Sequence, residues 1–240
     1  MAKTYIVTGA SRGLGLEFVK QLLKRGDIVF AAARNPDSSK GLQALSGNEK
    51  LHLVQLDALS EESIKAAAAE IEKKAPEGVD VLINNAGICG EMGLDFEQTS
   101  KNELVKVFET NVAAVNEVSK AFVPILRKRG AGCVKKILNM SSLLGSISSM
   151  EDATGYGFGV AYCVSKAGTN MLTRAMSSKL GKENFIVYSS HPGWVQTDMG
   201  GGEAPVTTEA SISGMLARLD SITAEDNGKF FDFESKTIGW

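Results

Sequence analysis

The chain contains 240 residues, of which 43% are hydrophobic, and its formal net charge at neutral pH is -2. This length and apolar content are sufficient for a single domain of α/β size with a large buried core. The near-neutral charge gives no electrostatic reason to expect a nucleic acid or an anionic membrane surface as a partner. No apolar run approaches the roughly 18 residues that a membrane-spanning helix needs.

The number and spacing of the cysteines are typical of a protein in a reducing compartment, and the first residues do not resemble a secretory leader. Cys89, Cys133 and Cys163 are odd in number, and no two of them have CxxC spacing. Neither a disulfide framework nor a zinc site is therefore expected. The first apolar run begins near Thr4 and has no charged-then-apolar leader before it. We expect a cytoplasmic protein that requires no metal ion.

Short runs rich in β-branched residues alternate with longer helical segments along the chain. Strands are predicted at residues 5–7, 28–30, 51–54, 79–83, 134–138, 185–188 and 228–233. Helices are predicted at residues 13–25, from 60 onward, at 103–128 with a possible kink at Pro124, and at 161–180. Strands separated by helices indicate βαβ units and a predominantly parallel sheet with helices on both faces. The sequence therefore predicts one α/β domain over residues 1–240.

Two irregular stretches interrupt this alternation, at residues 146–159 and 194–210. The first is rich in Gly, Ser and Asp, and the second contains three consecutive glycines. Both are predicted to be substrate loops of the domain, because loops held by a rigid sheet often carry specificity. Ordinary connections are the alternative for each. Four large side chains are candidates for an apolar substrate pocket, with core packing as the alternative: Phe158, Trp194, Met199 and Met215.

A glycine-rich turn joins the first strand to the first helix. Residues 8–15 read TGASRGLG, with GxxxGxG spacing rather than the commoner GxGxxG. Glycines let the backbone approach a pyrophosphate, whose charge is met by free N–H groups at the helix N-terminus. A plain tight turn is the alternative, but the position directly after the first strand favours cofactor binding. The predicted cofactor contacts here are Gly9, Ser11, Arg12, Gly13, Leu14 and Gly15.

The end of the second strand bears on the choice between NAD and NADP(H). A site for NAD would place an acidic residue about 20 residues after the glycines, but the sequence there reads Ala33-Arg34-Asn35. Arg34 and Arg12 offer two guanidinium groups for a 2′-phosphate. Solvated surface arginines are the alternative. With the acid missing, the pair favours NADP(H).

Tyr162 and Lys166 are four residues apart on a predicted helix and therefore share one face. A free phenol, with a pKa near 10, is a weak acid at neutral pH. A nearby ammonium group is expected to lower that pKa. Ser142 ends the fifth predicted strand, where open α/β sheets form their ligand crevice. Its hydroxyl could share a substrate carbonyl oxygen with the tyrosine.

Five motifs in order resemble the short-chain dehydrogenase/reductase family. They are the TGxxxGxG turn, NNAG at 84–87, Ser142, YxxxK at 162–166 and HPGWVQT at 191–197, and the resemblance runs from residue 4 to about residue 233. It implies a Rossmann-type, doubly wound, seven-stranded sheet that binds a nicotinamide cofactor.

The resemblance also implies a role for each matching residue. Tyr162 would be the acid in reduction and the base in oxidation, and Lys166 would bind the nicotinamide ribose and lower the tyrosine pKa. Ser142, rather than Ser141, would orient the substrate, and Asn111 would hold a proton-relay water. Tyr162 and Lys166 would also contact the cofactor, with Asp57, Ala58, Asn85, Ala86, Gly87, Pro192, Gly193, Val195 and Thr197. Structural packing is expected for His52, His191 and Cys163.

Within the family, the chain is most similar to sniffer-type carbonyl reductases and to the C-factor-like group. Ser142 and Tyr162 are 20 positions apart, more than is usual in the family, and the extra residues fall in 146–159. Many members associate through the helix that carries the tyrosine. An insertion beside this helix favours a monomer or a homodimer.

These motifs together predict NADPH-dependent reduction of an aldehyde or ketone, with the proton supplied by Tyr162. The partner would be a small carbonyl or alcohol compound, and no metal ion is needed. One alternative is an NAD-dependent alcohol dehydrogenase working in the oxidative direction. Another is a C-factor-like signalling or scaffold protein whose turnover is incidental, because a fold alone does not define a function.

Overall fold

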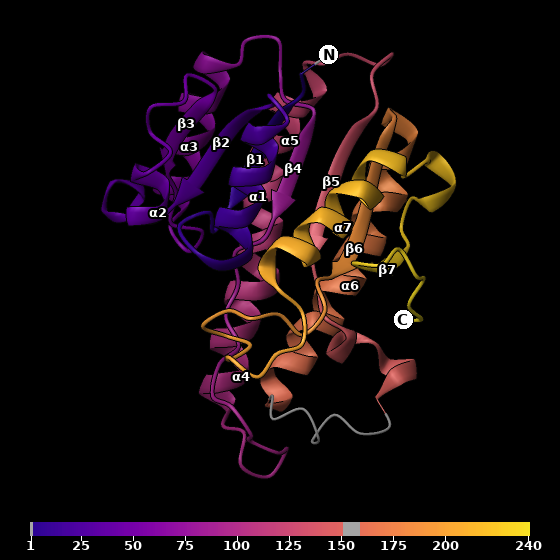
Figure 1. Cartoon of the computed structure of the whole chain (residues 1–240). Helices are drawn as coiled ribbons and strands as arrows, with labels where there is room; N and C mark the ends of the chain where they lie inside the picture. Colours follow the sequence, from indigo (N-terminus) through magenta and orange to yellow (C-terminus); the bar gives the residue numbers. More distant parts are fainter. Residues whose placement is uncertain (1, 151–158) are drawn as a thin grey trace.

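A single sheet of seven parallel strands organises the computed structural model, which describes residues 2–150 and 159–240 (Figure 1). The strand order is β3-β2-β1-β4-β5-β6-β7, and every neighbouring pair is parallel. The order reverses between β1 and β4, where such sheets bind ligands. The predicted doubly wound sheet is confirmed, with strands β1 (Thr4–Thr8), β2 (Ile28–Ala33), β3 (Leu51–Gln55), β4 (Val81–Asn84), β5 (Lys135–Met140), β6 (Phe185–His191) and β7 (Phe230–Asp232).

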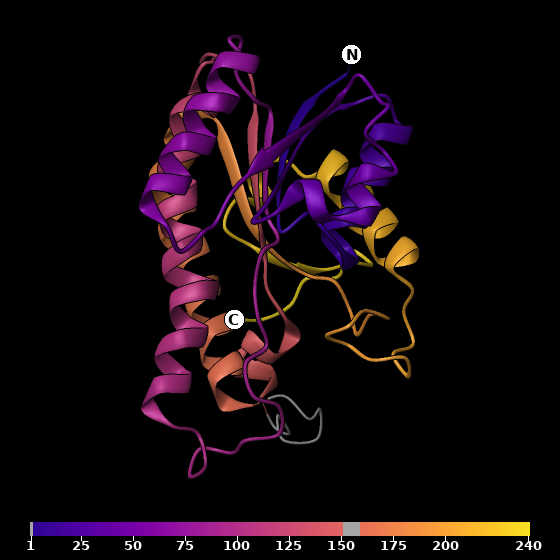
Figure 2. The same ribbon diagram turned by 90° about the vertical axis from the view of Figure 1, so that its left-hand side faces the viewer.

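Helices cover both faces of this sheet, as Figure 2 shows, with α1 and α7 on one side and α3, α5 and α6 on the other. Along β6, Ile186 and Tyr188 belong to the apolar cluster under α1 and α7. The alternate residues Phe185 and Val187 belong to the cluster on the opposite face. The helices are α1 (Gly13–Lys24), α2 (Lys40–Gln43), α3 (Glu61–Lys74), α4 (Lys101–Phe108), α5 (Ala114–Arg127), α6 (Val160–Leu180) and α7 (Thr208–Ser221).

The predicted long helix over 103–128 is confirmed as a continuous helical stretch at 101–127, although one internal turn is π-helical rather than α-helical. The structure has α4 and α5, separated by a π-helical turn at Glu109–Ala113, whereas Pro124 lies inside α5. The wider turn frees backbone groups, and the Thr169 hydroxyl donates a hydrogen bond to the Asn111 carbonyl oxygen at 3.0 Å. Turns of this kind are often found at functional sites, and this one places Asn111 beside α6.

Helix α7 was not predicted from the sequence, and because its cap is Thr207, the loop predicted over 194–210 ends three residues earlier. Thr207 caps the helix by accepting a hydrogen bond from the backbone N–H of Ala210 at 3.1 Å. Ile212, Met215 and Leu219 recur at helical spacing and are buried. Met215 therefore belongs to the core rather than to a substrate pocket. Phe158 lies outside the described residues. The four-residue α2, also missed, is too short to show a period.

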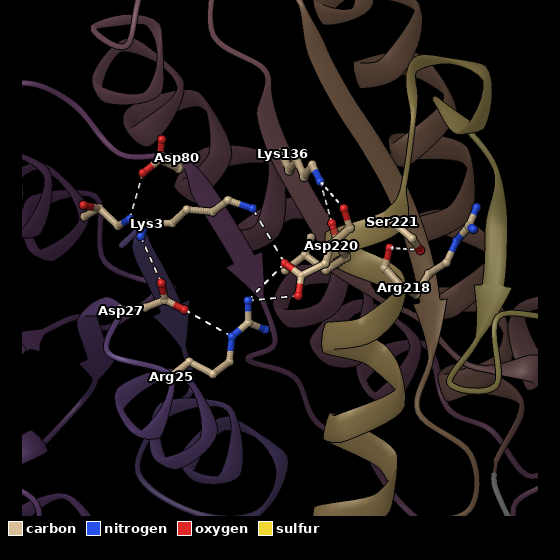
Figure 3. Close-up of polar contacts among 10 residues, drawn as sticks. Lys3, Arg25, Asp27, Asp80, Lys136, Arg218, Asp220 and Ser221 are labelled. Carbon is tan, nitrogen blue, oxygen red and sulfur yellow. Dashed lines mark hydrogen bonds and ion pairs between the residues drawn. The ribbon is translucent and has the colours of Figure 1, made fainter. Parts of the chain in front are cut away.

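Charged groups at the amino ends of the strands anchor the end of α7 (Figure 3). Asp220, in the last turn of α7, forms ion pairs with Arg25 at 2.9 Å and with Lys3 at 3.6 Å. From β5, the Lys136 ammonium donates a hydrogen bond to the Leu219 carbonyl oxygen at 2.6 Å. A cation at a helix C-terminus satisfies carbonyl groups that have no partner within the helix. These contacts fix the orientation of the helix that follows the loop at 194–207.

A chain of buried side-chain hydrogen bonds crosses the other face of the sheet. Asn84 donates to the Oδ1 of Asn139 at 2.8 Å and to the Ser119 hydroxyl at 2.9 Å. Asn139 donates in turn to the Thr173 hydroxyl of α6, at 2.9 Å. That hydroxyl also accepts a hydrogen bond from Ser189 of β6, again at 2.9 Å. This series of side-chain hydrogen bonds links β4, β5 and β6 to the helices that pack on them.

No helix among the described residues combines the length and apolar character needed to cross a membrane.

The substitution Asn139→Leu should destabilise the fold, because it leaves the amide of Asn84 and the hydroxyl of Thr173 with fewer buried partners. We expect the free energy of unfolding to fall by about 2–4 kcal/mol, measured by urea denaturation. Asn102→Leu, at an exposed position on α4, is the control and should change stability little. Equal stability of the Asn139 variant and the unmodified protein would contradict a stabilising role of these buried hydrogen bonds.

Candidate active site

The turn between β1 and α1 has a backbone that requires glycine. Gly9 and Gly13 have positive φ angles of 65° and 53°, which side chains other than glycine rarely adopt. A Cβ atom at Gly15 would collide with the Gly9 carbonyl oxygen and lie 2.6 Å from the Asn85 Nδ2 atom. No side chain in the described part of the chain caps the N-terminus of α1, so its N–H groups are available to an anion. The turn therefore fits a dinucleotide pyrophosphate.

The residues after β4 hold this turn in place. The Thr8 hydroxyl accepts hydrogen bonds from the backbone N–H groups of Asn85 at 3.0 Å and Ala86 at 3.1 Å. The Asn85 amide donates to the Thr8 carbonyl oxygen at 2.9 Å. Its side chain therefore supports the glycine turn, a contact that sequence spacing does not reveal. A Cβ at Gly87 would lie 3.0 Å from the Asn111 Oδ1 atom, so this glycine permits a close approach.

The two candidate 2′-phosphate ligands differ in their surroundings. The glycine turn lies against the end of β2, because the Ala10 N–H donates to the Ala32 carbonyl oxygen at 3.1 Å. Arg34 follows that strand, is exposed, and has no ion pair or side-chain hydrogen bond with any other described residue. Arg12 forms an ion pair with Asp198 of the loop after β6. Arg34 is therefore the more available of the two cations.

Asp57 and Ala58 follow β3, beside the end of β2. The Leu56 N–H donates to the Ala33 carbonyl oxygen at 2.8 Å, which sets this register. The Asp57 carboxylate accepts a hydrogen bond from the Leu59 N–H at 3.1 Å within the turn that leads to α3. One carboxylate oxygen thus shapes the local turn, and adenine contact by this residue stays a prediction.

A cavity of about 200 Å³ lies at the carboxyl ends of the strands. It brings together residues from the glycine turn, the end of β5, the first turn of α6 and the segment after β6, although these are far apart in the sequence. Its walls are formed by Leu14, Ser141, Ser142, Leu143, Leu144, Tyr162, His191, Pro192, Gly193, Trp194, Val195, Thr197, Met199 and Gly200. Predicted cofactor and catalytic residues therefore share one cavity, and Trp194 and Met199 line it as pocket candidates.

Tyr162 is buried in the first turn of α6. Burial raises the pKa of its phenol, and a hydrogen bond with Ser142 offsets part of this shift. The expected lowering by Lys166 is not found. The Lys166 ammonium lies 5.5 Å from the tyrosine ring centroid and donates a hydrogen bond to the Met140 carbonyl oxygen at 2.9 Å. Motif spacing predicted the proximity of the two groups but not the desolvation of the phenol, which is the main cause of its raised pKa.

Lys166 is itself buried, at 5% exposure. Loss of hydration disfavours its charged form and lowers the pKa of the ammonium to about 8. The lysine therefore titrates much closer to neutral pH than a solvated lysine does.

Asn111 is buried and joins three segments of the site. Its Oδ1 atom accepts a hydrogen bond from the Ile88 N–H at 2.9 Å, and its Nδ2 atom donates to the Ile88 carbonyl oxygen at 2.8 Å. The same amide donates to the Ser165 hydroxyl on α6 at 2.9 Å. The segment after β4 is thus fastened to the catalytic helix. The role of Asn111 in holding a proton-relay water stays a prediction.

Asn170, one turn after Lys166 on α6, was missed by the sequence analysis. Its Oδ1 atom accepts a hydrogen bond from the Ser141 hydroxyl at 2.6 Å, and its Nδ2 atom donates to the Gly145 carbonyl oxygen at 3.0 Å. It therefore holds both ends of the segment that carries Ser142. The spacing of four residues from Lys166 places it on the same helix face, and this was the signal available in the sequence.

The loop after β6 folds back on itself beside the cavity. The Trp194 indole N–H donates to the Gly200 carbonyl oxygen at 2.7 Å, and the Gln196 N–H donates to the Val206 carbonyl oxygen at 2.9 Å. A Cβ at Gly13 would lie 3.6 Å from the Thr197 methyl group. The loop therefore reaches the glycine turn, and both segments carry residues that were predicted to contact the cofactor.

A ligand cavity at the carboxyl ends of a doubly wound parallel sheet is the hallmark of nucleotide-binding α/β proteins. The model of the short chain dehydrogenase family matches residues 3–205, so the chain belongs to this family.

Three similar proteins support the subgroup. The NADPH-bound carbonyl reductase from chicken fatty liver is 36% identical, with a TM-score of 0.92 over 100% of this chain and 99% of that one. The carbonyl reductase Sniffer of D. melanogaster is 30% identical, with a TM-score of 0.91 and full coverage of both chains. The C-signal protein of Myxococcus xanthus is 36% identical over 68% of this chain and 93% of its own length. The resemblance to sniffer-type and C-factor-like proteins is confirmed.

The buried lysine should make stability depend on pH. The folded-state pKa of Lys166 is lowered to about 8, so between that value and the ordinary lysine pKa the unfolded chain binds more protons. Stability contributed by this site therefore rises with pH in that window. Between about pH 7.5 and 9.5, this site should add about 2 kcal/mol to the free energy of unfolding, and Lys166→Met should remove that increment.

Denaturant unfolding of both proteins at the two pH values tests this expectation. Lys136, whose pKa burial also lowers to about 8, remains in both proteins and cancels in the comparison. An equal pH dependence in both would show that the lysine at 166 titrates normally in the folded state.

Proposed function

We propose that the chain is an NADP(H)-dependent carbonyl reductase, which reduces an aldehyde or ketone to the alcohol. The observation that carries this proposal is the single cavity that joins Leu14 of the glycine turn with Ser142 and Tyr162. A cofactor held by the turn and a substrate held by the two hydroxyl groups would meet there. The similarity to an NADPH-bound carbonyl reductase supports the same activity.

The cofactor would lie along the carboxyl ends of the strands. The N-terminus of α1 would hold the pyrophosphate, and Arg34 would bind the 2′-phosphate of the adenosine ribose. Val195 and Thr197, both at the cavity, would hold the carboxamide. Bound NADPH supplies a hydride to the carbonyl carbon. The chain itself supplies position, because holding both reactants in one small cavity removes much of the entropic barrier.

Tyr162 and Ser142 would bind the substrate carbonyl oxygen. Both hydroxyls line the cavity and are hydrogen-bonded to each other, so an oxygen placed between them would receive two donors as negative charge develops. Tyr162 then gives its proton to the alkoxide. Its raised pKa keeps the phenol protonated at physiological pH, which is the form that reduction requires. Alcohol oxidation would need the phenolate, and burial disfavours it.

We also propose that residues 1–240 act as one domain in a monomeric or homodimeric state. The substrate loops would be 194–207 and 146–159, and residues 151–158 of the latter lie outside the described part of the chain. The match to C-signal keeps a signalling role as a second candidate. The buried Ser142 and Tyr162, which line the cavity and are hydrogen-bonded to each other, favour catalytic turnover. A scaffold function would not require a proton-donating phenol in the wall of a ligand cavity.

Tyr162→Phe should reduce kcat for carbonyl reduction by at least about 100-fold, the usual loss when a general acid is removed. NADPH affinity should change much less than kcat, because the glycine turn and Arg34, which would hold the phosphates, are unaltered. NADPH absorbance with a panel of aldehydes and ketones measures both the activity and its loss. Tyr5→Phe removes a buried hydroxyl with no hydrogen-bond partner among the described residues and is the matched control. Unchanged turnover in the Tyr162 variant would overturn the assignment of Tyr162 as the proton donor.

Arg34→Ala should weaken NADPH binding by about tenfold to a hundredfold, the equivalent of one or two charge-assisted hydrogen bonds. NADH affinity should stay the same, because NADH has no 2′-phosphate. Titration calorimetry with the two cofactors measures the difference. Arg127→Ala, which removes an exposed arginine paired with Glu183, is the control. An equal loss of affinity for both cofactors would contradict the assignment of Arg34 to the phosphate.

A further inference from the structure

The imidazole of His191, a residue in the wall of the catalytic cavity, has no hydrogen-bond partner among the described residues. It is the last residue of β6, and it lines the same cavity as Ser142 and Tyr162. Its Nδ1 atom is buried and unpaired, and neither ring nitrogen bonds any other described residue. A buried polar atom without a partner costs free energy. The sequence analysis expected this histidine to be structural, but no structural contact of its nitrogens is found among the described residues.

The other polar side chains of the cavity wall are already engaged. The Ser141 hydroxyl donates to Asn170 at 2.6 Å, and the Thr197 hydroxyl accepts a hydrogen bond from the Gly200 N–H at 3.1 Å. Ser142 is paired with the catalytic phenol. The remaining side chains are mainly apolar, such as Leu143 and Trp194. His191 therefore stands out as a spare hydrogen-bonding group in a predominantly apolar wall.

The position of His191 relative to the reacting carbonyl follows from the strand register. The Ser141 N–H donates to the Ser190 carbonyl oxygen at 2.8 Å, so the ends of β5 and β6 lie side by side. His191 thus lies beside Ser141 and one residue away from Ser142. Neighbouring strands are about 4.8 Å apart, and the shared cavity measures only about 200 Å³, so a small substrate held at Ser142 would bring its neighbouring carbon close to His191.

Burial lowers the pKa of His191 to about 4, so its ring is neutral at physiological pH. A neutral imidazole has one N–H donor and one acceptor nitrogen. It can therefore bind either a carbonyl oxygen or a hydroxyl group without bringing a charge into the cavity.

We propose that His191 is a specificity-determining residue, which binds a second oxygen on the carbon next to the reacting carbonyl. The favoured substrates are then compact, otherwise apolar compounds such as vicinal diketones and α-hydroxy ketones, in preference to the matching simple ketones. This inference rests on the proposed function. A site built to bind a substrate oxygen discriminates strongly against the analogue that lacks it, because its own polar group is then left unpaired.

Diacetyl and butanone form a suitable probe pair, because they share a carbon skeleton and differ by one carbonyl oxygen. Diacetyl is intrinsically the more reactive ketone, so the quantity compared is the ratio of variant to unmodified kcat/KM for each compound. His191→Leu should lower kcat/KM for diacetyl by about tenfold or more, the equivalent of one lost hydrogen bond to a buried group. For butanone the change should stay within about threefold. His191→Gln, which keeps a donor and an acceptor, should restore much of the selectivity.

His52→Leu is the matched control, since that histidine stacks on Phe30 at 4.8 Å in the β3–β2 part of the sheet and should not affect selectivity. Thermal unfolding of each variant accompanies the kinetics. Equal losses for both ketones in His191→Leu, with a lowered melting temperature, would show a structural role and overturn the inference. Unchanged kinetics would overturn it as well. Failure of the unmodified protein to reduce either ketone, or any other carbonyl, with NADPH would overturn the proposed function itself.

Discussion

The hydrogen bond between Asn139 and Thr173 fixes the catalytic helix relative to the sheet. Asn139 lies on β5, two residues before Ser141 and three before Ser142, and Thr173 lies on α6, seven residues after Lys166. Seven residues are close to two helical turns, so the threonine and the lysine share the face that packs on the sheet. The distance between Ser142 on the sheet side and Tyr162 on α6 therefore depends on this buried contact. The sheet is covered on both faces, so no water is present to replace the Asn139–Thr173 hydrogen bond if it is lost.

The opposite wall of the cavity depends on a different anchor. The loop at 194–207 leads directly into α7, and that helix is held at its far end by Asp220 and by the ammonium of Lys136. The loop is also closed internally by the Trp194–Gly200 hydrogen bond. Contacts at the amino ends of the strands thus help to set the shape of a cavity at their carboxyl ends, although none of these charges touches it.

Much of this architecture follows from patterns in the sequence, because burial repeats with the period of each element. The parallel sheet and the shared face of Tyr162 and Lys166 were predictable in this way, and the position of Ser142 at the end of its strand indicated that it meets Tyr162. Helix α7 was predictable too, since Ile212 and Met215 follow helical spacing. The π-helical turn was not, because the hydroxyl that satisfies the Asn111 carbonyl comes from Thr169, 58 residues later in the chain.

Side-chain environment was the other gap between sequence and structure. The YxxxK spacing indicates that a phenol and an ammonium are neighbours, but it carries no information on how much water surrounds them. Likewise, strand alternation assigns His191 to a face of β6 but does not show that its ring nitrogens lack partners. Both properties arise from the packing of several distant segments around one cavity, which local patterns do not encode.

Burial moves the pKa values of Tyr162 and Lys166 in opposite directions, and this reverses their order as acids. In water the two groups have similar pKa values. In the folded protein the phenol is raised above its ordinary value, while the ammonium is lowered to about 8. The lysine is therefore the stronger acid. In the proposed reduction Tyr162 gives up its proton and becomes a phenolate. Transfer of a proton from the Lys166 ammonium to this phenolate is then favourable, because the ammonium is the stronger acid. The low dielectric environment that makes the phenol a weak acid thus also favours its reprotonation.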